Sequence, residues 1–222
     1  MNALSLSRFA TAPSRREPKY KNGGVIMRNA TIKRKTKETD IELSLNILEY
    51  GKKGSLKGTS GIGFFDHMLN SFCSHGGFDV ELKCEGDLFV DGHHTVEDIG
   101  IVLGMALKEA AGDMRGIKRF SDILMPMDEA LIMCALDYSG RSYLYFESDF
   151  ASPMIGDYDT QLTVEFMRAL SFNAGITLHL KKLYGANDHH VTEALYKAAG
   201  KCIGDALKIV SDEVMSTKGL LS

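Results

Sequence analysis

The sequence lacks any long apolar run, any CxxC pair and any strong excess of charge of one sign. Without about 18 consecutive apolar residues, no helix is predicted to span a membrane. A net charge of -3 gives no reason to expect binding to nucleic acid or to a membrane surface. The cysteines lie far apart in sequence, which predicts reduced and mostly buried thiols of an intracellular protein without a disulfide framework. They are Cys73, Cys84, Cys134 and Cys202.

Proline is also scarce, with 4 residues against 22 glycines, which indicates tight turns in a compact fold rather than long linkers. The length of 222 residues suits one large domain or two small, closely packed ones. Residues 1–26 are basic and serine-containing and have no apolar period, so we predict a disordered N-terminal extension. A plain tail is favoured, and a cleavable targeting segment or a true start at Met27 are the alternatives.

The pentapeptide His-His-x-x-Glu occurs twice, as His93–Glu97 and His189–Glu193, and with His67 these stretches hold five of the seven histidines. On a helix, residues four apart share a face, whereas neighbours point about 100° apart. Adjacent histidines therefore do not share an ion, and we predict two metal sites, each completed from elsewhere. Imidazole and carboxylate without thiolate suit first-row divalent ions and argue against a structural zinc knot. Capped helix starts with surface histidines are the alternative, which the second copy argues against.

The first half of the chain alternates strand and helix patterns. A strict period of two predicts strands at 29–36 and 39–49, followed by a glycine- and lysine-rich connection over 51–63. Apolar residues at helical spacing place His67 on a helix over 64–72. Further strands are expected at 80–83 and 88–90, and the first pentapeptide then opens a helix that ends near Gly112.

The second half repeats this order. Strands are predicted at 130–138 and 141–147, joined as a hairpin by Ser139-Gly140. After a loop through Pro153 follow a helix at 161–172, a strand at 176–180 and a pentapeptide helix that runs to about Val210. The repeat pairs His67 with Glu165, because they precede their pentapeptides by similar spacings. We expect an α+β fold of two similar halves, 27–116 and 117–222, packed back to back as one compact unit.

Several motifs, in this order, resemble imidazoleglycerol-phosphate dehydratase over about Ile32 to Leu220. They are Lys37–Thr39, Phe64–Leu69, Asp91–Asp98, Pro126–Ala130, Asp137–Arg141, Thr177–His179, Asn187–His190 and Ser216–Gly219. The resemblance implies a tandem repeat of two ribosomal-protein-S5-domain-2-like halves, each a roughly four-stranded sheet with two helices on one face.

The resemblance also implies a cytoplasmic lyase of histidine biosynthesis. The expected reaction is dehydration of D-erythro-imidazole-glycerol phosphate to imidazole-acetol phosphate, with the substrate imidazole activated as imidazolate by two Mn²⁺ ions per active site. The family is further expected to form a homo-oligomer of 24 subunits with active sites between subunits.

Motif positions imply the ligands of each ion. One ion would be held by His67, His94, Glu97 and His190, and the other by His93, His189, Glu193 and Glu165. Many relatives have histidine where this chain has Glu165, but a carboxylate is a competent ligand for a hard ion.

Other residues are expected to act on the substrate. Glu38 and Asp128 are candidates for proton transfer or hydroxyl positioning, and with the ligands Glu97 and Glu193 they make the expected catalytic set. The phosphate group is expected to meet Arg119, Arg141, Lys197, Ser216 and Lys218. His179 is expected to support the site indirectly or structurally, and His75 to cap a helix C-terminus.

Two other functions are compatible with the sequence. Paired divalent ions also activate water, so a metal-dependent hydrolase is one alternative. In the other, metals only link subunits and the S5-like halves bind nucleic acid. The slightly acidic chain shows no basic stripe interleaved with aromatic residues, which argues against the second.

Overall fold

The structure is a computed structural model that describes residues 28–216. The predicted N-terminal extension and the expected phosphate ligand Lys218 lie outside the described residues. The boundaries 27–116 and 117–222 of the two halves remain predictions.

The first half contains a four-stranded sheet and two helices. The strand order is β1-β2-β4-β3, with β3 parallel to β4 and the other neighbours antiparallel. The elements are β1 (Arg28–Lys35), β2 (Thr39–Ile47), β3 (Ser55–Gly58), α1 (Gly63–Gly76), β4 (Phe78–Gly86) and α2 (His93–Ala111).

The second half repeats this topology with strand order β5-β6-β10-β7, in which β7 is parallel to β10. Its elements are β5 (Phe120–Met127), β6 (Ala130–Tyr138), β7 (Tyr143–Glu147), α3 (Leu162–Ala174), β10 (Ile176–Tyr184) and α4 (Asp188–Ala206). A small ribbon of β8 (Met154–Ile155) and β9 (Tyr158–Asp159) interrupts the expected loop before α3. The predicted α+β duplication is therefore confirmed.

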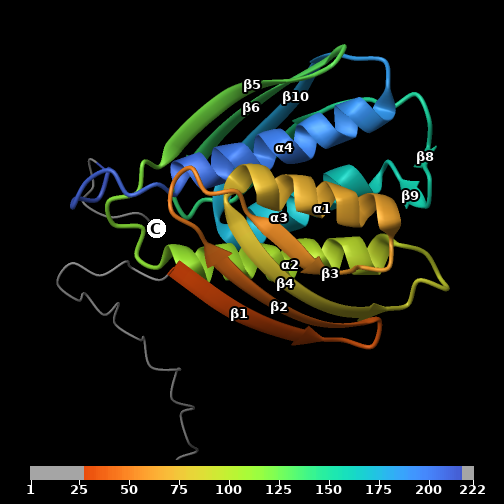
Figure 1. The fold of residues 1–222 in the computed structure, drawn as a ribbon, viewed down its shortest axis with the longest axis horizontal. Helices are drawn as coiled ribbons and strands as arrows, with labels where there is room; N and C mark the ends of the chain where they lie inside the picture. The colour runs from red at the N-terminus through yellow and green to blue at the C-terminus, as the bar shows by residue number, and fades with distance from the viewer. Residues whose placement is uncertain (1–27, 217–222) are drawn as a thin grey trace, which may run out of the picture.

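The helices lie between the two sheets (Figure 1). The alternation of buried and exposed residues along β2 explains this arrangement. Ile41, Leu43 and Leu45 are each 1% exposed and form part of the core beneath the helices, whereas their neighbours are more exposed. The helices then pair across the halves, α1 with α4 and α2 with α3. The two halves thus share one core, and their helix faces, not their sheets, meet at the centre.

Glycine allows the α1–α4 pair to approach very closely. A Cβ atom on Gly200 would lie 2.3 Å from the carbonyl oxygen of Phe72, and one on Gly204 would lie 2.1 Å from that of Gly76. In the equivalent α2–α3 pair, a Cβ on Gly100 would lie 2.9 Å from the carbonyl oxygen of Phe166. The helix backbones are therefore in contact, and side chains one turn apart on α4 are held at a fixed distance from α1.

The predicted strand at 88–90 is wrong. These residues form a turn closed by a 2.8 Å hydrogen bond from Val90 N to Asp87 O, and Phe89 is 91% exposed. Periodicity cannot distinguish three apolar residues in a strand from three in a turn. Here the chain must turn from the end of β4 to the start of α2.

The predicted hairpin of 130–138 with 141–147 is also wrong, because β10 lies between β6 and β7. Ser139-Gly140 turns the chain, but the strand that pairs with β6 through a tight turn is β5, which was not predicted.

The connection over 51–63 also differs from the prediction, because it contains the short strand β3. The last helix ends at Ala206, earlier than predicted.

Candidate metal centre

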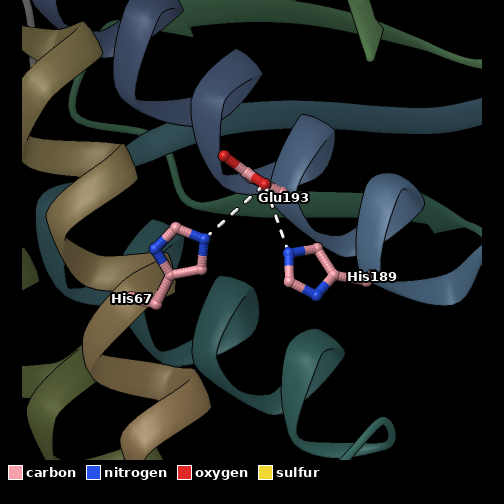
Figure 2. Close-up of side chains that lie close together, drawn as sticks. All are labelled: His67, His189 and Glu193. Carbon is pink, nitrogen blue, oxygen red and sulfur yellow. Dashed lines mark ion pairs between the residues drawn. The ribbon is translucent and has the colours of Figure 1, made fainter. Parts of the chain in front are cut away.

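Three of the predicted ligands meet between α1 and α4. His67 comes from α1, and His189 and Glu193 lie one turn apart on α4 (Figure 2). Glu193 Oε2 is 3.6 Å from His67 Nε2 and 3.4 Å from His189 Nε2. Their three ligand atoms all lie within 4.8 Å of one another, and no other group of three or more such donors within residues 28–216 does so.

Contacts from its own helix and from α1 orient the Glu193 carboxylate. Its Oε1 accepts a hydrogen bond from Ser71 Oγ at 3.4 Å and lies 2.8 Å from Lys197 Nζ, so Oε2 is left facing the two imidazoles. Burial raises the pKa of Glu193, but the hydrogen bond and charge of Lys197 outweigh it and the net pKa is lowered. An ionised carboxylate and two imidazoles are a donor set that fits a divalent ion.

A side chain accepts a backbone hydrogen bond at the start of each pentapeptide helix, and in α4 this residue, Asn187, is the N-cap itself. Asp91 Oδ1 accepts from His93 N at 2.7 Å, and Asn187 Oδ1 accepts from His189 N at 3.0 Å. An Asp or Asn two residues before the first histidine thus satisfies a backbone donor that has no partner within the helix. The duplication therefore includes this hydrogen bond as well as the predicted ligands.

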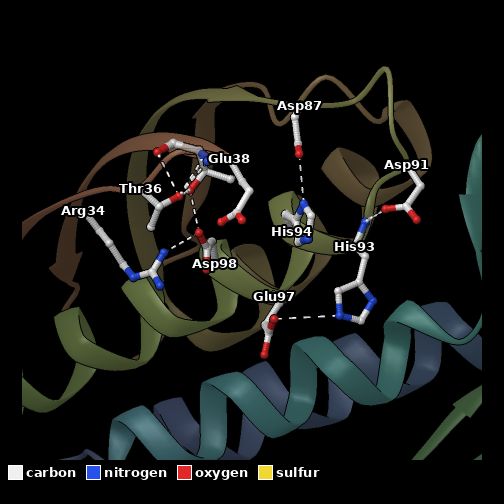
Figure 3. Close-up of polar contacts among 10 residues, drawn as sticks. Arg34, Thr36, Glu38, Asp87, Asp91, His93, His94, Glu97 and Asp98 are labelled. Carbon is white, nitrogen blue, oxygen red and sulfur yellow. Dashed lines mark hydrogen bonds and ion pairs between the residues drawn. The ribbon is translucent and has the colours of Figure 1, made fainter.

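The first pentapeptide is more open than the second. His93 Nε2 lies 3.8 Å from Glu97 Oε2, and the Glu97 side chain is 44% exposed (Figure 3). Glu165, which was predicted to bind the same ion as His93, His189 and Glu193, forms an ion pair with Arg168 one turn along α3. Within the single chain, His93, Glu97 and Glu165 do not come together as His67, His189 and Glu193 do between α1 and α4.

Adjacent histidines point in different directions, as helix geometry predicts. The rings of His93 and His94 have an interplanar angle of 89°, and those of His189 and His190 one of 80°. Within one chain, His67 therefore lies beside His189. It does not lie beside His94 and His190, the second histidines of the pairs, with which it was expected to share an ion. Because the expected sites lie between subunits, the two four-ligand sets stay predictions.

The second histidine of each pair contacts a carboxylate through Nδ1. His94 Nδ1 lies 3.0 Å from Asp87 Oδ2, and His190 Nδ1 lies 2.7 Å from Glu129 Oε2. The pKa of each imidazole is raised, above all by this hydrogen bond. The pKa of Glu129 is lowered to about 2, first by His190 and then by the backbone N–H of Asn187. Neither Asp87 nor Glu129 was predicted, since local spacing does not connect them to the histidines.

The expected catalytic carboxylates lie at the ends of equivalent hairpins. Glu38 is in the β1–β2 turn, and its backbone oxygen accepts from Asp87 N at 3.0 Å. Asp128 is in the β5–β6 turn with a φ of 48°, a left-handed conformation that Asp tolerates. Its Oδ2 lies 3.6 Å from His190 Nε2. Both hairpins therefore approach the second histidine of a pair.

Asp98, which follows the first pentapeptide, anchors the β1–β2 hairpin on α2. It is 6% exposed, accepts a 2.5 Å hydrogen bond from Thr39 Oγ1 and pairs with Arg34 (Figure 3). The position of Glu38 relative to α2 is thus set by a buried polar contact.

Two of the expected phosphate ligands share one carboxylate. Arg119 Nε lies 2.7 Å from Asp137 Oδ1, and an Arg141 guanidinium nitrogen lies 3.2 Å from Asp137 Oδ2. Asp137 raises the pKa of Arg119 through this hydrogen bond. Arg119 also donates to the carbonyl of Met215, next to the expected ligand Ser216. Lys197 lies against Glu193 instead, and Asp137 was not predicted to have a role in the site.

The remaining histidines occupy structural positions. His75 Nδ1 lies 2.9 Å from Ser71 O within α1, whereas the C-cap of this helix is Gly77, so the expected capping role of His75 is wrong. His179 lies on β10, where its ring packs against Tyr145 and Tyr143 of β7 at centroid distances of 5.6 and 6.0 Å. These contacts place His179 in the second sheet.

The described residues also form a groove of about 1090 Å³, away from the predicted ligands. Its lining includes Arg28, Tyr50, Lys52 and Lys208 and the C-terminal ends of α1 and α4. Basic side chains are favourable beside helix C-termini, where carbonyl groups lack partners. Arg28 donates to the carbonyl of Leu207 at the end of α4, and Lys208 pairs with Asp205 and lies over the ring of Tyr50.

A duplicated α+β fold with imidazole and carboxylate donors gathered between paired helices has the features of a candidate metal-dependent enzyme. The family model described as imidazoleglycerol-phosphate dehydratase matches residues 60–203. An imidazoleglycerol-phosphate dehydratase of Caldicellulosiruptor saccharolyticus is 54% identical over 194 residues, covering 87% of this chain and 98% of that protein. The chain therefore belongs to the imidazoleglycerol-phosphate dehydratase family, whose members are hydro-lyases.

Solved structures of the family agree with this assignment. The enzyme from Pyrococcus furiosus has a TM-score of 0.72 and 37% identity, covering 86% of this chain and 100% of that one. The enzyme from Staphylococcus aureus has a TM-score of 0.73 and 34% identity, with coverage of 82% and 99%. Among the described residues, no helix is long and apolar enough to cross a membrane.

Proposed function

We propose that this chain dehydrates D-erythro-imidazole-glycerol phosphate to imidazole-acetol phosphate in histidine biosynthesis. The observation that carries the proposal is the His67–His189–Glu193 cluster, because it lies on helices within the family match and has the donors that a divalent ion needs. A cytoplasmic location for this biosynthetic step stays a prediction.

We infer two Mn²⁺ ions per active site, held by the two four-ligand sets expected from the motifs. Glu193 is ionised and oriented for this task, and Glu97 is its counterpart in the repeat. When bound, the ions would supply Lewis acidity toward the imidazole nitrogens of the substrate. Glu165 is proposed to ligate after leaving its exposed ion pair with Arg168, which costs little.

The hairpin carboxylates would move the protons. Dehydration removes a carbon-bound proton and expels a hydroxyl group, which leaves as water once it is protonated. Glu38 and Asp128 approach the second histidines from equivalent turns, so one carboxylate could take the proton while the other positions or protonates the hydroxyl. Two carboxylates with separate positions suit this division of work.

The substrate phosphate would meet Arg119 and Arg141. Asp137 fixes both guanidinium groups and leaves N–H groups of the more exposed Arg141 available to an anion. Ser216 follows the carbonyl that Arg119 contacts, which supports its predicted role. Lys197 and Lys218 complete the proposed cation set, with Lys197 already bound to Glu193.

We propose a homo-oligomer, of 24 subunits as the resemblance implies, whose active sites lie between subunits. The single chain gathers three ligands between α1 and α4 but leaves the first pentapeptide and the second histidines without a full set. Exposed imidazoles next to the exposed apolar turn 88–90 are consistent with completion by another copy.

Turnover of imidazole-glycerol phosphate by metal-free and Mn²⁺-loaded protein tests the proposal. We expect imidazole-acetol phosphate to form only in the loaded sample, and His189→Ala to abolish it. A generic phosphate ester serves as the second substrate. Its hydrolysis, with imidazole-glycerol phosphate left unchanged, would establish a metal-dependent hydrolase instead.

A further inference from the structure

We propose that Asp87 and Glu129 are positioning residues that fix the tautomers of His94 and His190, so that each presents an unprotonated Nε2 to a metal ion. This inference rests on the proposed function, in which both histidines are metal ligands. Neither carboxylate belongs to the expected ligand or catalytic sets.

The geometry at the two sites is the same although the carboxylates come from different elements. Asp87 precedes the turn before α2, and Glu129 lies in the β5–β6 turn. Each places one oxygen within 3.0 Å of Nδ1 of the second histidine. An ionised carboxylate can only accept, so Nδ1 carries a proton, and in the neutral imidazole Nε2 is then the nitrogen with a free lone pair.

The first histidine of each pair indicates which nitrogen would face a bound metal ion. His93 and His189 both direct Nε2 toward the glutamate four residues on. If the second histidines also ligate through Nε2, all four imidazoles of the repeat use the same nitrogen. Neutral imidazole has two tautomers, and a second hydrogen bond selects between them and raises the basicity of the ligating nitrogen.

Burial and backbone contacts hold the two carboxylates in place. The Asp87 side chain is 14% exposed, and its second oxygen is buried without a hydrogen-bond donor among the described residues. Its backbone N–H is bonded to Glu38 O. Glu129 uses its other oxygen to accept from Asn187 N at 2.8 Å. Asp87 is thus the cleaner site for a test, because replacing Glu129 also removes a contact at the start of α4.

The test measures Mn²⁺ binding to the full-length metal-free protein, with free Mn²⁺ counted by electron paramagnetic resonance. We expect Asp87→Ala to weaken binding of one ion by about 10- to 100-fold. Asp87→Asn should restore most of the affinity, because the amide oxygen still accepts from Nδ1–H. Glu147→Ala, which removes an exposed carboxylate on the edge strand β7, is the matched control and should bind as the unaltered protein does.

His94→Ala and the melting temperature of the metal-free protein separate the outcomes. Loss of one ion in His94→Ala with weakened binding in Asp87→Ala supports the inference. Loss of an ion in His94→Ala with unchanged binding in Asp87→Ala overturns it and leaves the proposed function standing. Full binding in His94→Ala overturns the proposed ligation itself. A lowered melting temperature in both Asp87 variants, with no recovery of binding in Asp87→Asn, would show a structural role and also overturn the inference.

Discussion

Glu193 uses its two carboxylate oxygens for different purposes. One is bound to Lys197 and Ser71, and the other faces His67 and His189. A buried carboxylate without a cation would have a raised pKa and would bind a proton in place of a metal ion. Lys197 therefore prepares the ligand in the absence of metal, in addition to any contact with substrate.

Lys197→Met tests this at the scale of one residue. The metal-free variant should lose about 1–3 kcal/mol of unfolding free energy, because a largely buried carboxylate loses its charged partner. Chemical denaturation measures the change. Lys57→Met breaks an exposed pair with Glu81 at 2.9 Å and should change stability by less than about 1 kcal/mol. Equal losses in both variants would contradict the role given to Lys197.

The pH dependence of metal binding follows from the second histidines. The pKa of His94 and of His190 is raised by Asp87 and Glu129, so each imidazole binds a proton at higher pH than an unperturbed histidine. Because Mn²⁺ must displace that proton, its affinity should fall as the pH falls through the raised pKa values. The stability of the metal-free fold should change with pH in the opposite direction. The His94–Asp87 and His190–Glu129 pairs stabilise it while the imidazoles are protonated, and this stabilisation is lost as the pH rises through their raised pKa values.

Mn²⁺ titrations between about pH 5.5 and 8.5, paired with melting curves of the metal-free protein, check both signs. Affinity that is constant over this range would contradict protonation of the ligating histidines.

At the scale of elements, the α1–α4 contact sets the distance between His67 and its partners. Gly200→Ala places a methyl group 2.3 Å from Phe72 O, so the helices must separate. We expect a loss of about 1–3 kcal/mol or more and weaker Mn²⁺ binding, measured by denaturation and metal titration. Gly156→Ala meets no atom within 4 Å and strains only a left-handed residue at φ 62°, so it should destabilise without weakening Mn²⁺ binding. Undiminished metal affinity in Gly200→Ala would contradict the account.

The helices were predicted well because their signal is local. Apolar spacing places α1, α2, α3 and α4 to within a few residues, and the repeated pentapeptide predicts where imidazoles concentrate. The edge strands β3 and β5 were missed, since one is very short and the other buries little of its length. The pairing of β7 with β10 depends on a strand that comes much later in the chain, so a local turn signal gave the wrong neighbour.

The same limit applies to the site. His189 and Glu193 are one helical turn apart, and spacing alone predicts their convergence. Their meeting with His67 depends on helix packing across the two halves, and the contacts of Asp87 and Glu129 depend on loops. Positions fixed by tertiary structure leave no regular spacing to find.

At the scale of the whole molecule, the proposed sites lie between copies of the chain. If metal ions link subunits, removing them should release smaller particles. Light scattering or native mass spectrometry before and after chelation measures this, and restored Mn²⁺ should rebuild the assembly. A particle whose mass is unchanged after complete metal removal would show that protein contacts alone hold the subunits together.

The most direct test of the central claim is a titration of metal-free protein with Mn²⁺, in which dehydration of imidazole-glycerol phosphate is followed at each addition. The duplicated His-His-x-x-Glu segments predict that turnover reaches its plateau at two ions per subunit. Full turnover without added metal, or a plateau at one ion, would contradict a site built from both copies.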